Sequence, residues 1–160
     1  MSNVRFAVAE DAARIAEILA HVGELHAKGR PDIFHGKMLY DPERKIRNHI
    51  EDEDDGVCFI VSTNEQDEIT GALMCYFDEV PSDDELYVSS KVLWIESNGV
   101  DEQYRGKGYG KMLLDYVKAF AKEQECYRIK LSVWSFNEHA FEFYKSQGME
   151  ISSYSMEYKL

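Results

Sequence analysis

Three glycines and three cations crowd a short segment just past the middle of the chain. The segment reads Arg105-Gly106-Lys107-Gly108-Tyr109-Gly110 and is followed by Lys111. Glycine has no Cβ atom, so backbone N–H groups can approach a ligand closely there. A strand pattern precedes the segment and a helix pattern follows it, and a helix N-terminus carries about half a positive charge. The segment is therefore predicted to bind phosphate groups.

This glycine turn differs from the two common nucleotide-binding loops. It lacks the GxxxxGK[ST] spacing of a P-loop, and it does not match GxGxxG. It also lies past the chain midpoint instead of after the first strand. The alternative is a plain glycine-rich turn, which the flanking cations disfavour because a structural turn does not need them.

Two segments resemble the signatures of the GNAT superfamily of N-acetyltransferases. Arg105 to Gly110 matches the R-x-x-G-x-G/A pyrophosphate-binding signature of that family. Asn137 to Met149 is similar to its second signature, N-x-x-A-x-x-F-Y-x-x-x-G-F, with Met149 in place of the usual phenylalanine. The order of the expected elements also matches, so the resemblance covers essentially the whole chain.

The resemblance implies an α/β (α+β) fold with a cleft for acetyl-CoA as the acetyl donor. Its sheet would be mixed and mainly antiparallel, with about six to seven strands and about four flanking helices. The sheet would be splayed open between the fourth and fifth strands, and CoA would lie in that opening. By the same resemblance, Asn98 and Val100 would pair with the pantetheine arm, and Asn137 would bond to CoA, cap its helix, or do both. No metal is implied.

A glycine inside a strand supports that reading. Asn98-Gly99 falls within a long strand pattern, and glycine there often marks a bulge or a close approach of another backbone.

Tyr144 is the candidate acid. It lies where the family commonly has a tyrosine near the CoA sulfur. A phenol with an ordinary pKa of about 10 can protonate a departing thiolate. The alternative is a core aromatic packed beside Phe141 and Phe143.

Glu96 is the candidate base. An amine with a pKa of about 10.4 is neutral in roughly one molecule in 2,500 at pH 7, so a base that removes the proton helps the reaction. Period-two alternation puts Glu96 on the strand face of Asn98 and Val100. An ordinary ion pair is the alternative role for Glu96, and Glu85 or a chain of waters is the alternative base.

The pattern along the chain predicts one domain over residues 1–160, with no linker or repeat. The expected elements are strands over 4–8, 57–63, 69–77, 87–100, 128–133 and 151–158, and helices over 9–28, from 41–42 onward, 108–125 and 137–147.

The net charge of −12 lies in one half of the chain. Residues 1–90 carry 8 basic and 20 acidic side chains, whereas residues 91–160 are neutral. Glu79, Asp83, Asp84 and Glu85 cluster before the strand that carries Glu96. Carboxylates around a cleft attract cations, so we hypothesise a cationic amine as the acceptor. The alternative is that the acidic half only keeps the protein soluble.

Other features narrow the class of protein. The acidic balance argues against nucleic-acid binding, and no apolar run approaches the roughly 20 residues of a membrane span. Three scattered cysteines suggest neither disulfides nor a metal site, and a cytoplasmic location is expected. The resemblance implies that the connection between the first two helices, which carries His35, borders the acceptor pocket. Trp94 and Trp134 are expected in strands, as core or cleft wall.

The leading hypothesis is acetylation of a small-molecule amine. Acetylation of protein or peptide amines and a catalytically silent acyl-CoA-binding module stay open. The acceptor's identity is not fixed by any motif. A homodimer is an expectation from the family alone.

Overall fold

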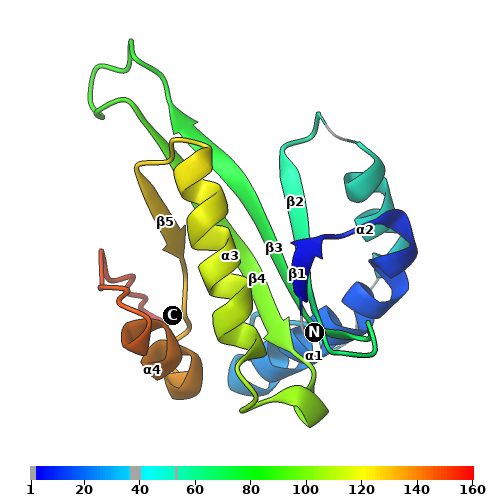
Figure 1. Cartoon of the computed structure of the whole chain (residues 1–160). Helices are drawn as coiled ribbons and strands as arrows, with labels where there is room; N and C mark the ends of the chain where they lie inside the picture. The colour runs from blue at the N-terminus through cyan, green and yellow to red at the C-terminus, as the bar shows by residue number, and fades with distance from the viewer. Residues whose placement is uncertain (1–2, 37–40, 53) are drawn as a thin grey trace.

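A five-stranded mixed sheet forms the centre of the molecule (Figure 1). The computed structural model describes residues 3–36, 41–52 and 54–160. The strands follow one another across the sheet in chain order: β1 (Asn3–Phe6), β2 (Val57–Thr63), β3 (Ile69–Val80), β4 (Ser90–Val100) and β5 (Arg128–Leu131). The first three pairings are antiparallel and the β4–β5 pairing is parallel, as expected for a mixed, mainly antiparallel sheet.

Helices cover both faces of the sheet. They are α1 (Ala12–Gly29), α2 (Pro42–Glu51), α3 (Tyr109–Glu123) and α4 (Glu138–Ser146), with short 3-10 turns η1 (Ala9–Asp11) and η2 (Glu102–Tyr104). The Asp41 carboxylate accepts a hydrogen bond from the Arg44 N–H (3.1 Å), and Pro42 follows, so α2 begins as its cap predicts. No helix in the described ranges is long and apolar enough to cross a membrane.

Two hydrophobic clusters, one on each face, hold the layers together. Alternation along β2 sends Ile60 toward α3 and Phe59 and Val61 toward α1 and α2. The α3 side also buries Leu73 and Leu93, and both are fully inaccessible to solvent. Apolar packing on both faces therefore holds the sheet, including β4, between the helices.

The predicted final strand over 151–158 is wrong, and the sheet has five strands instead of six to seven. In the described part of the chain, residues 151–160 form no strand and every one of them is exposed. An extended segment becomes a strand only when its backbone pairs with a neighbour. Here the segment leaves the sheet, and Glu157 instead pairs with Arg30 beyond the end of α1 (2.5 Å).

Gly99 lets α1 approach β4 closely. A Cβ atom built at Gly99 would lie 2.8 Å from Val22 Cγ2 and 3.2 Å from Ile18 Cγ2. Glycine here makes room for side chains of α1, whereas the nearest backbone atom, the Ile18 carbonyl oxygen, would lie 3.6 Å from that Cβ, an ordinary contact. The irregularity of β4 lies elsewhere, because the register with β3 slips between Ile95 and Ser97.

We expect Gly99→Ala to lower the free energy of unfolding by about 1–3 kcal/mol, because the added methyl overpacks the α1–β4 contact. Gly23→Ala is the matched control, since its Cβ would meet no described atom within 4 Å and alanine favours a helix. Urea unfolding of both variants checks this. Equal stability of Gly99→Ala and the wild type would contradict the contact.

Candidate active site

A cleft opens where β4 and β5 diverge. Their pairing runs from Val92–Arg128 to Ile95–Leu131 and then stops, although β4 continues to Val100. The resulting cavity of about 70 Å³ is lined by residues of α1, β4, the end of β5 and the segment after it, and α4: Val22, His26, Ile95, Glu96, Ser97, Asn98, Leu131, Ser132, Val133, Trp134, Asn137, Ala140 and Tyr144. The sheet is therefore splayed between its fourth and fifth strands, as expected.

A hydrogen bond crosses this cleft. Asn98 Nδ2 donates to Tyr144 Oη at 3.2 Å, joining β4 to α4. Burial raises the pKa of Tyr144 above its ordinary value of 10, and the bond from Asn98 partly opposes that rise. Tyr144 therefore stays protonated at neutral pH. Because Asn98 occupies a lone pair of the phenol oxygen, the phenol proton is left available to another acceptor.

The other end of the Asn98 amide has no partner. Asn98 Oδ1 is buried and accepts no hydrogen bond from any described residue. A buried polar atom without a partner costs about 1–3 kcal/mol, and such atoms are a common mark of a ligand site. An N–H group of a ligand in the cleft would satisfy it.

Glu96 lies at the slip in register. Met74 pairs with Ser97 and Cys75 pairs with Ile95, so Glu96 has no register partner within the described sheet. The register shift interrupts the period-two alternation at Glu96. Alternation therefore does not place Glu96 on the same strand face as Asn98 and Val100. Glu96 is exposed at the edge of the cleft. Burial, and then the charge of Glu96, raise the pKa of the nearby Tyr76.

His26 is a cleft residue that the sequence reasoning missed. Its ring lies 5.1 Å from that of Phe34 and 6.2 Å from that of Phe136, centroid to centroid. Burial lowers its pKa below the ordinary 6.5, so the ring is neutral at pH 7. Its place four residues after Val22, in line with the buried Ile15 and Ile18 on the inner face of α1, is a signal that could have found it.

The glycine turn comes after β4 and leads into α3, as predicted, with η2 between the strand and the turn. Gly106 (φ +75°) and Gly108 (φ +92°) have left-handed backbones, which explains glycine at both positions. Gly108 is the N-cap of α3, and the first N–H groups of a helix have no partner within it. Lys107 Nζ lies 5.3 Å from the Tyr104 ring centroid. The free N–H groups at the start of α3, together with the cations of the turn such as Lys107, form a site that can bind an anion.

The remaining turn residues have partners of their own. Arg105 Nε donates to the Val100 carbonyl (3.2 Å), which ties the turn to the strand end. Lys111 pairs with Asp115. Tyr109, the first residue of α3, packs edge-on against Tyr104 at 5.9 Å.

Asn137 caps α4, one of the two roles expected for it. Its Oδ1 accepts from the Ala140 N–H (3.1 Å), while its amide NH₂ group can still donate. Trp134 lies in the cleft wall beyond the end of β5, so the expectation of a strand there is wrong, whereas Trp94 is in β4 as expected. His35 is exposed and does not line the cleft.

The acidic cluster of Glu79, Asp83, Asp84 and Glu85 lies near the N-terminal end of β4, the end opposite the glycine turn. Glu79 pairs with Lys91 (3.7 Å), and Glu85 belongs to the connection just before β4 begins. On this strand Lys91 lies four residues from Ile95, where the cleft lining begins, and seven from Asn98, about 13 and 23 Å at 3.3 Å per residue. The expectation that these carboxylates surround the cleft is therefore wrong, and Glu85 is too distant to be its base.

Known proteins share this fold and its signatures. The model of the acetyltransferase (GNAT) family matches residues 20–149. The chain therefore belongs to the GNAT acetyltransferase family.

Two solved structures show how closely the fold is shared. A tetramutant of the BH1408 protein from Bacillus halodurans superposes with a TM-score of 0.89 at 27% identity, covering 99% of each chain. Glucosamine-6-phosphate N-acetyltransferase from Arabidopsis thaliana has a TM-score of 0.69 at 20% identity, covering 99% of this chain and 98% of that one, a likeness of fold alone.

A curated relative matches over a shorter stretch. The chain is 36% identical over 61 residues, 38% of its length, to the spermine/spermidine N(1)-acetyltransferase of Bacillus subtilis. The match spans 40% of that protein's own length.

We predict that His26 titrates below pH 6.5. Its unfolded form binds a proton near that value and its folded form only at lower pH, so the free energy of unfolding falls as the pH drops below about 6.5. Phe34→Ala should move the pKa of His26 back toward 6.5 by admitting water. An NMR titration of the ring protons measures both. Phe6→Ala, in an aromatic cluster with Tyr116 and Phe120, is the control. A pKa at or above 6.5 in the wild type would contradict the burial argument.

Proposed function

We propose that this chain is an acetyl-CoA-dependent N-acetyltransferase whose acceptor is a primary amine on a small polycationic molecule. The observation that carries the proposal is the Asn98–Tyr144 bond across the cleft, with an unpartnered oxygen beside it. Family membership supports the reaction class. The relative named as a spermine/spermidine N(1)-acetyltransferase supports polyamines as the acceptor class.

The cleft and the turn together fit the donor. The first-turn N–H groups of α3, with Arg105, Lys107 and Lys111, would hold the pyrophosphate. Asn98 and Val100 would hold the pantetheine arm, and Asn98 Oδ1 can accept from one of its amide N–H groups. The NH₂ group of Asn137 would donate to the same ligand. Acetyl-CoA supplies the acetyl thioester.

Two side chains would move the protons. Glu96 takes a proton from the ammonium form of the acceptor, and the neutral nitrogen then forms a bond to the acetyl carbon as the C–S bond breaks. Tyr144 gives its proton to the departing sulfur, and the acylated nitrogen, which still carries one proton too many for an amide, gives that proton back to the phenolate. The raised pKa of Tyr144 suits this role because the phenol is protonated before the reaction.

A carboxylate at the cleft favours a cationic acceptor, and only carboxylates close to the cleft have this effect. Salt screens exposed charges beyond about 8–10 Å, so carboxylates about 13–23 Å from the cleft lining contribute little steering at physiological salt. Glu96 at its edge is the near carboxylate that can pair with an ammonium group. The preference for a cation therefore depends on Glu96 more than on the acidic connection.

Gly108→Asp should weaken acetyl-CoA binding at least tenfold, because it adds a carboxylate where phosphates would sit and strains the left-handed backbone. Gly56→Asp is the matched control, since Gly56 also has a positive φ (+73°) and open space but lies at the start of β2. Isothermal titration calorimetry measures both affinities. A folded Gly108→Asp protein with unchanged affinity would remove the turn from the binding site.

The function itself is tested by measuring CoA release from acetyl-CoA with polyamines, aminoglycosides, amino acids and peptides. We expect the fastest release with polyamines and a singly acetylated product in the mass spectrum. Faster release with peptides would favour a peptide acetyltransferase. Binding of acetyl-CoA without release for any amine would make the chain a silent binding module.

Glu96→Gln should lower kcat/KM for the best polyamine by about 10²–10⁴, the usual contribution of a general base. The residual rate should rise about tenfold per pH unit toward pH 10, since it follows the fraction of neutral amine. Glu85→Gln makes the same change at the far end of β4 and should leave rate and profile unaltered. A wild-type pH profile in Glu96→Gln would assign the base elsewhere.

A further inference from the structure

Two of the three cysteines face each other across the sheet. Cys58 on β2 and Cys75 on β3 are direct register partners. The Cα atoms of such opposed residues lie about 4.5–5.5 Å apart, within the roughly 4.4–6.8 Å that a disulfide spans. Both thiols are free, and both side chains belong to the hydrophobic cluster on the α3 side of the sheet. The two strands therefore hold a pair of thiols at a separation from which a disulfide can form.

The two thiols differ in burial and in acidity. Cys75 is fully inaccessible to solvent, whereas Cys58 is half-buried. The Cys75 thiol donates a hydrogen bond to the Cys58 sulfur, which lowers the pKa of Cys58. The same bond, together with burial, raises the pKa of Cys75. Because the thiolate is the reactive form, Cys58 is the thiol that an oxidant meets first, and Cys75 is the thiol that can then react with it.

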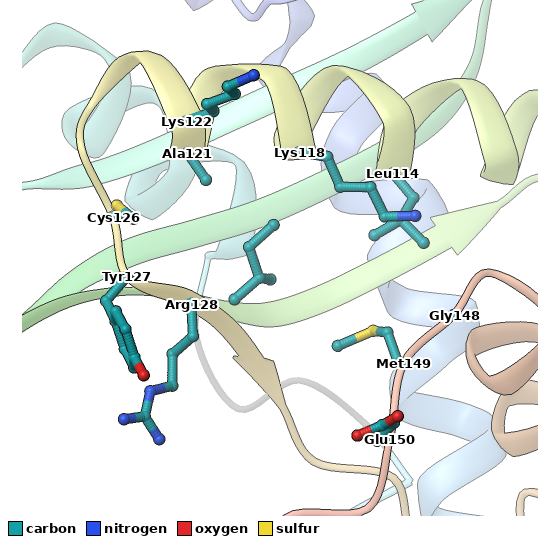
Figure 2. A pocket seen from close by; sticks show the side chains of 11 residues that line it. Leu114, Lys118, Ala121, Lys122, Cys126, Tyr127, Arg128, Gly148, Met149 and Glu150 are labelled. Atoms are coloured by element: carbon teal, nitrogen blue, oxygen red, sulfur yellow. The ribbon is translucent and has the colours of Figure 1, made fainter.

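The third cysteine belongs to the same cluster but lies in none of the described strands. Cys126 follows α3 and lines a cavity of about 480 Å³ between α3, β5 and the segment after α4 (Figure 2). It packs against the same hydrophobic cluster, and burial raises its pKa. Its charge contributes to the raised pKa of Cys75, so the two thiols are near neighbours. Cys126 is therefore both the control thiol and the alternative partner that a test has to exclude.

The thiol pair lies on a row of paired residues that crosses the sheet to the cleft. Cys58 pairs with Cys75, and Cys75 pairs with Ile95. Ile95 in turn pairs with Leu131, which is the last pair before β4 and β5 part, and both of these residues line the cleft. Glu96 follows directly, at the slip in register beside Cys75. A movement of Cys75 would therefore reach the candidate base through one backbone pairing.

We propose that Cys58 and Cys75 are a redox-sensitive thiol pair, whose disulfide shifts β3 at the point where it pairs beside Glu96 and so controls acetyl transfer. Cβ atoms of opposed residues lie about 4.5–5.5 Å apart, whereas a disulfide holds them about 3.8 Å apart. Forming the bond draws the two strands together by about 1 Å at this row. Because protein interiors are closely packed, the fully buried Cys75 passes this shift to its backbone partner Ile95. The control of acetyl transfer rests on the proposed function, whereas the disulfide and the shift do not.

The oxidant is a low-molecular-weight disulfide such as glutathione disulfide. The Cys58 thiolate attacks one glutathione sulfur, so a mixed disulfide forms and the first glutathione leaves. Cys75 then loses its proton and attacks the Cys58 sulfur, which releases the second glutathione. The protein gives up two electrons and two protons in all, and one glutathione disulfide becomes two glutathione molecules.

Peptide mapping of the full chain without reductant identifies the disulfide. After incubation with glutathione disulfide, we expect one linked pair of peptides that carry Cys58 and Cys75, lighter by two hydrogen atoms than the free peptides together. Cys58→Ser should abolish this link, and Cys126→Ser should retain it. A link between Cys75 and Cys126, glutathione adducts alone, or three unmodified thiols would overturn the proposal.

The shift beside the cleft is measured by the amide NMR resonances of Ile95, Glu96 and Ser97. We expect them to move on oxidation of the wild type and to return with dithiothreitol, while Cys58→Ser with the same oxidant shows no movement. Unmoved resonances in the fully oxidised protein would overturn the proposal.

The effect on acetyl transfer is measured as acetylated polyamine formed by the oxidised and the reduced protein. Oxidation should lower kcat/KM at least tenfold, since a displacement of about 1 Å at a reacting group can cost about 10²-fold. Dithiothreitol should restore the rate, and Cys58→Ser should keep its rate in the presence of the oxidant. An equal rate in the two states would overturn the control of catalysis. A chain without turnover in either state would remove the proposed function, and the mapping and the resonances would then decide the proposal on the thiol pair.

Discussion

The hydrogen bond from Asn98 to Tyr144 connects β4 to α4 just beyond the point where the pairing between β4 and β5 ends. β4 and β5 share four register pairs and then part. Beyond that point the amide of Asn98 links β4 directly to α4 at 3.2 Å. The reacting groups depend on this link because it orients the phenol of Tyr144, whereas the packing of Phe143 and Tyr144 on the core cluster holds α4 in place. The unpartnered Oδ1 atom belongs to the same Asn98 amide, and Asn98 lines the cleft.

The two ends of β4 have different roles. At one end, the strand runs into the glycine turn, where left-handed glycines and the start of α3 offer N–H groups to an anion. At the other end, the connection between β3 and β4 carries most of the clustered carboxylates. Because these carboxylates lie far from the cleft, the charge near the reacting groups comes from individual side chains such as Glu96. The acidic composition alone therefore says little about the acceptor.

Much of the fold followed from local patterns. The strand over 57–63 was predicted to the residue, because its apolar run has polar turns at both ends. The Asp41–Pro42 start of α2 and the glycine turn were also predicted, since capping and left-handed glycines are local features. The splayed sheet was predicted from the family resemblance, and the second signature supplies Asn137, Ala140 and Tyr144 to the cleft.

The errors arose where one element depends on another. The slip at Glu96 depends on the pairing of β3 with β4, which period-two alternation does not reveal. Residues 151–158 have a strand pattern but lack a partner strand in their own chain, and pattern alone does not supply one. The role of His26 depends on Phe34 and Phe136 folding over it from two other segments.

The most direct measurement of the central claim is kcat, together with acetyl-CoA affinity, for Tyr144→Phe. The loss of the phenol proton should lower kcat by about 10²-fold or more, while acetyl-CoA affinity stays nearly the same. Tyr116→Phe removes a hydroxyl from another partly buried tyrosine packed on the same core cluster, and it should behave as wild type. Equal turnover of Tyr144→Phe and the wild type would contradict the account, because Tyr144 would then only pack against Phe143 and hold α4 in place.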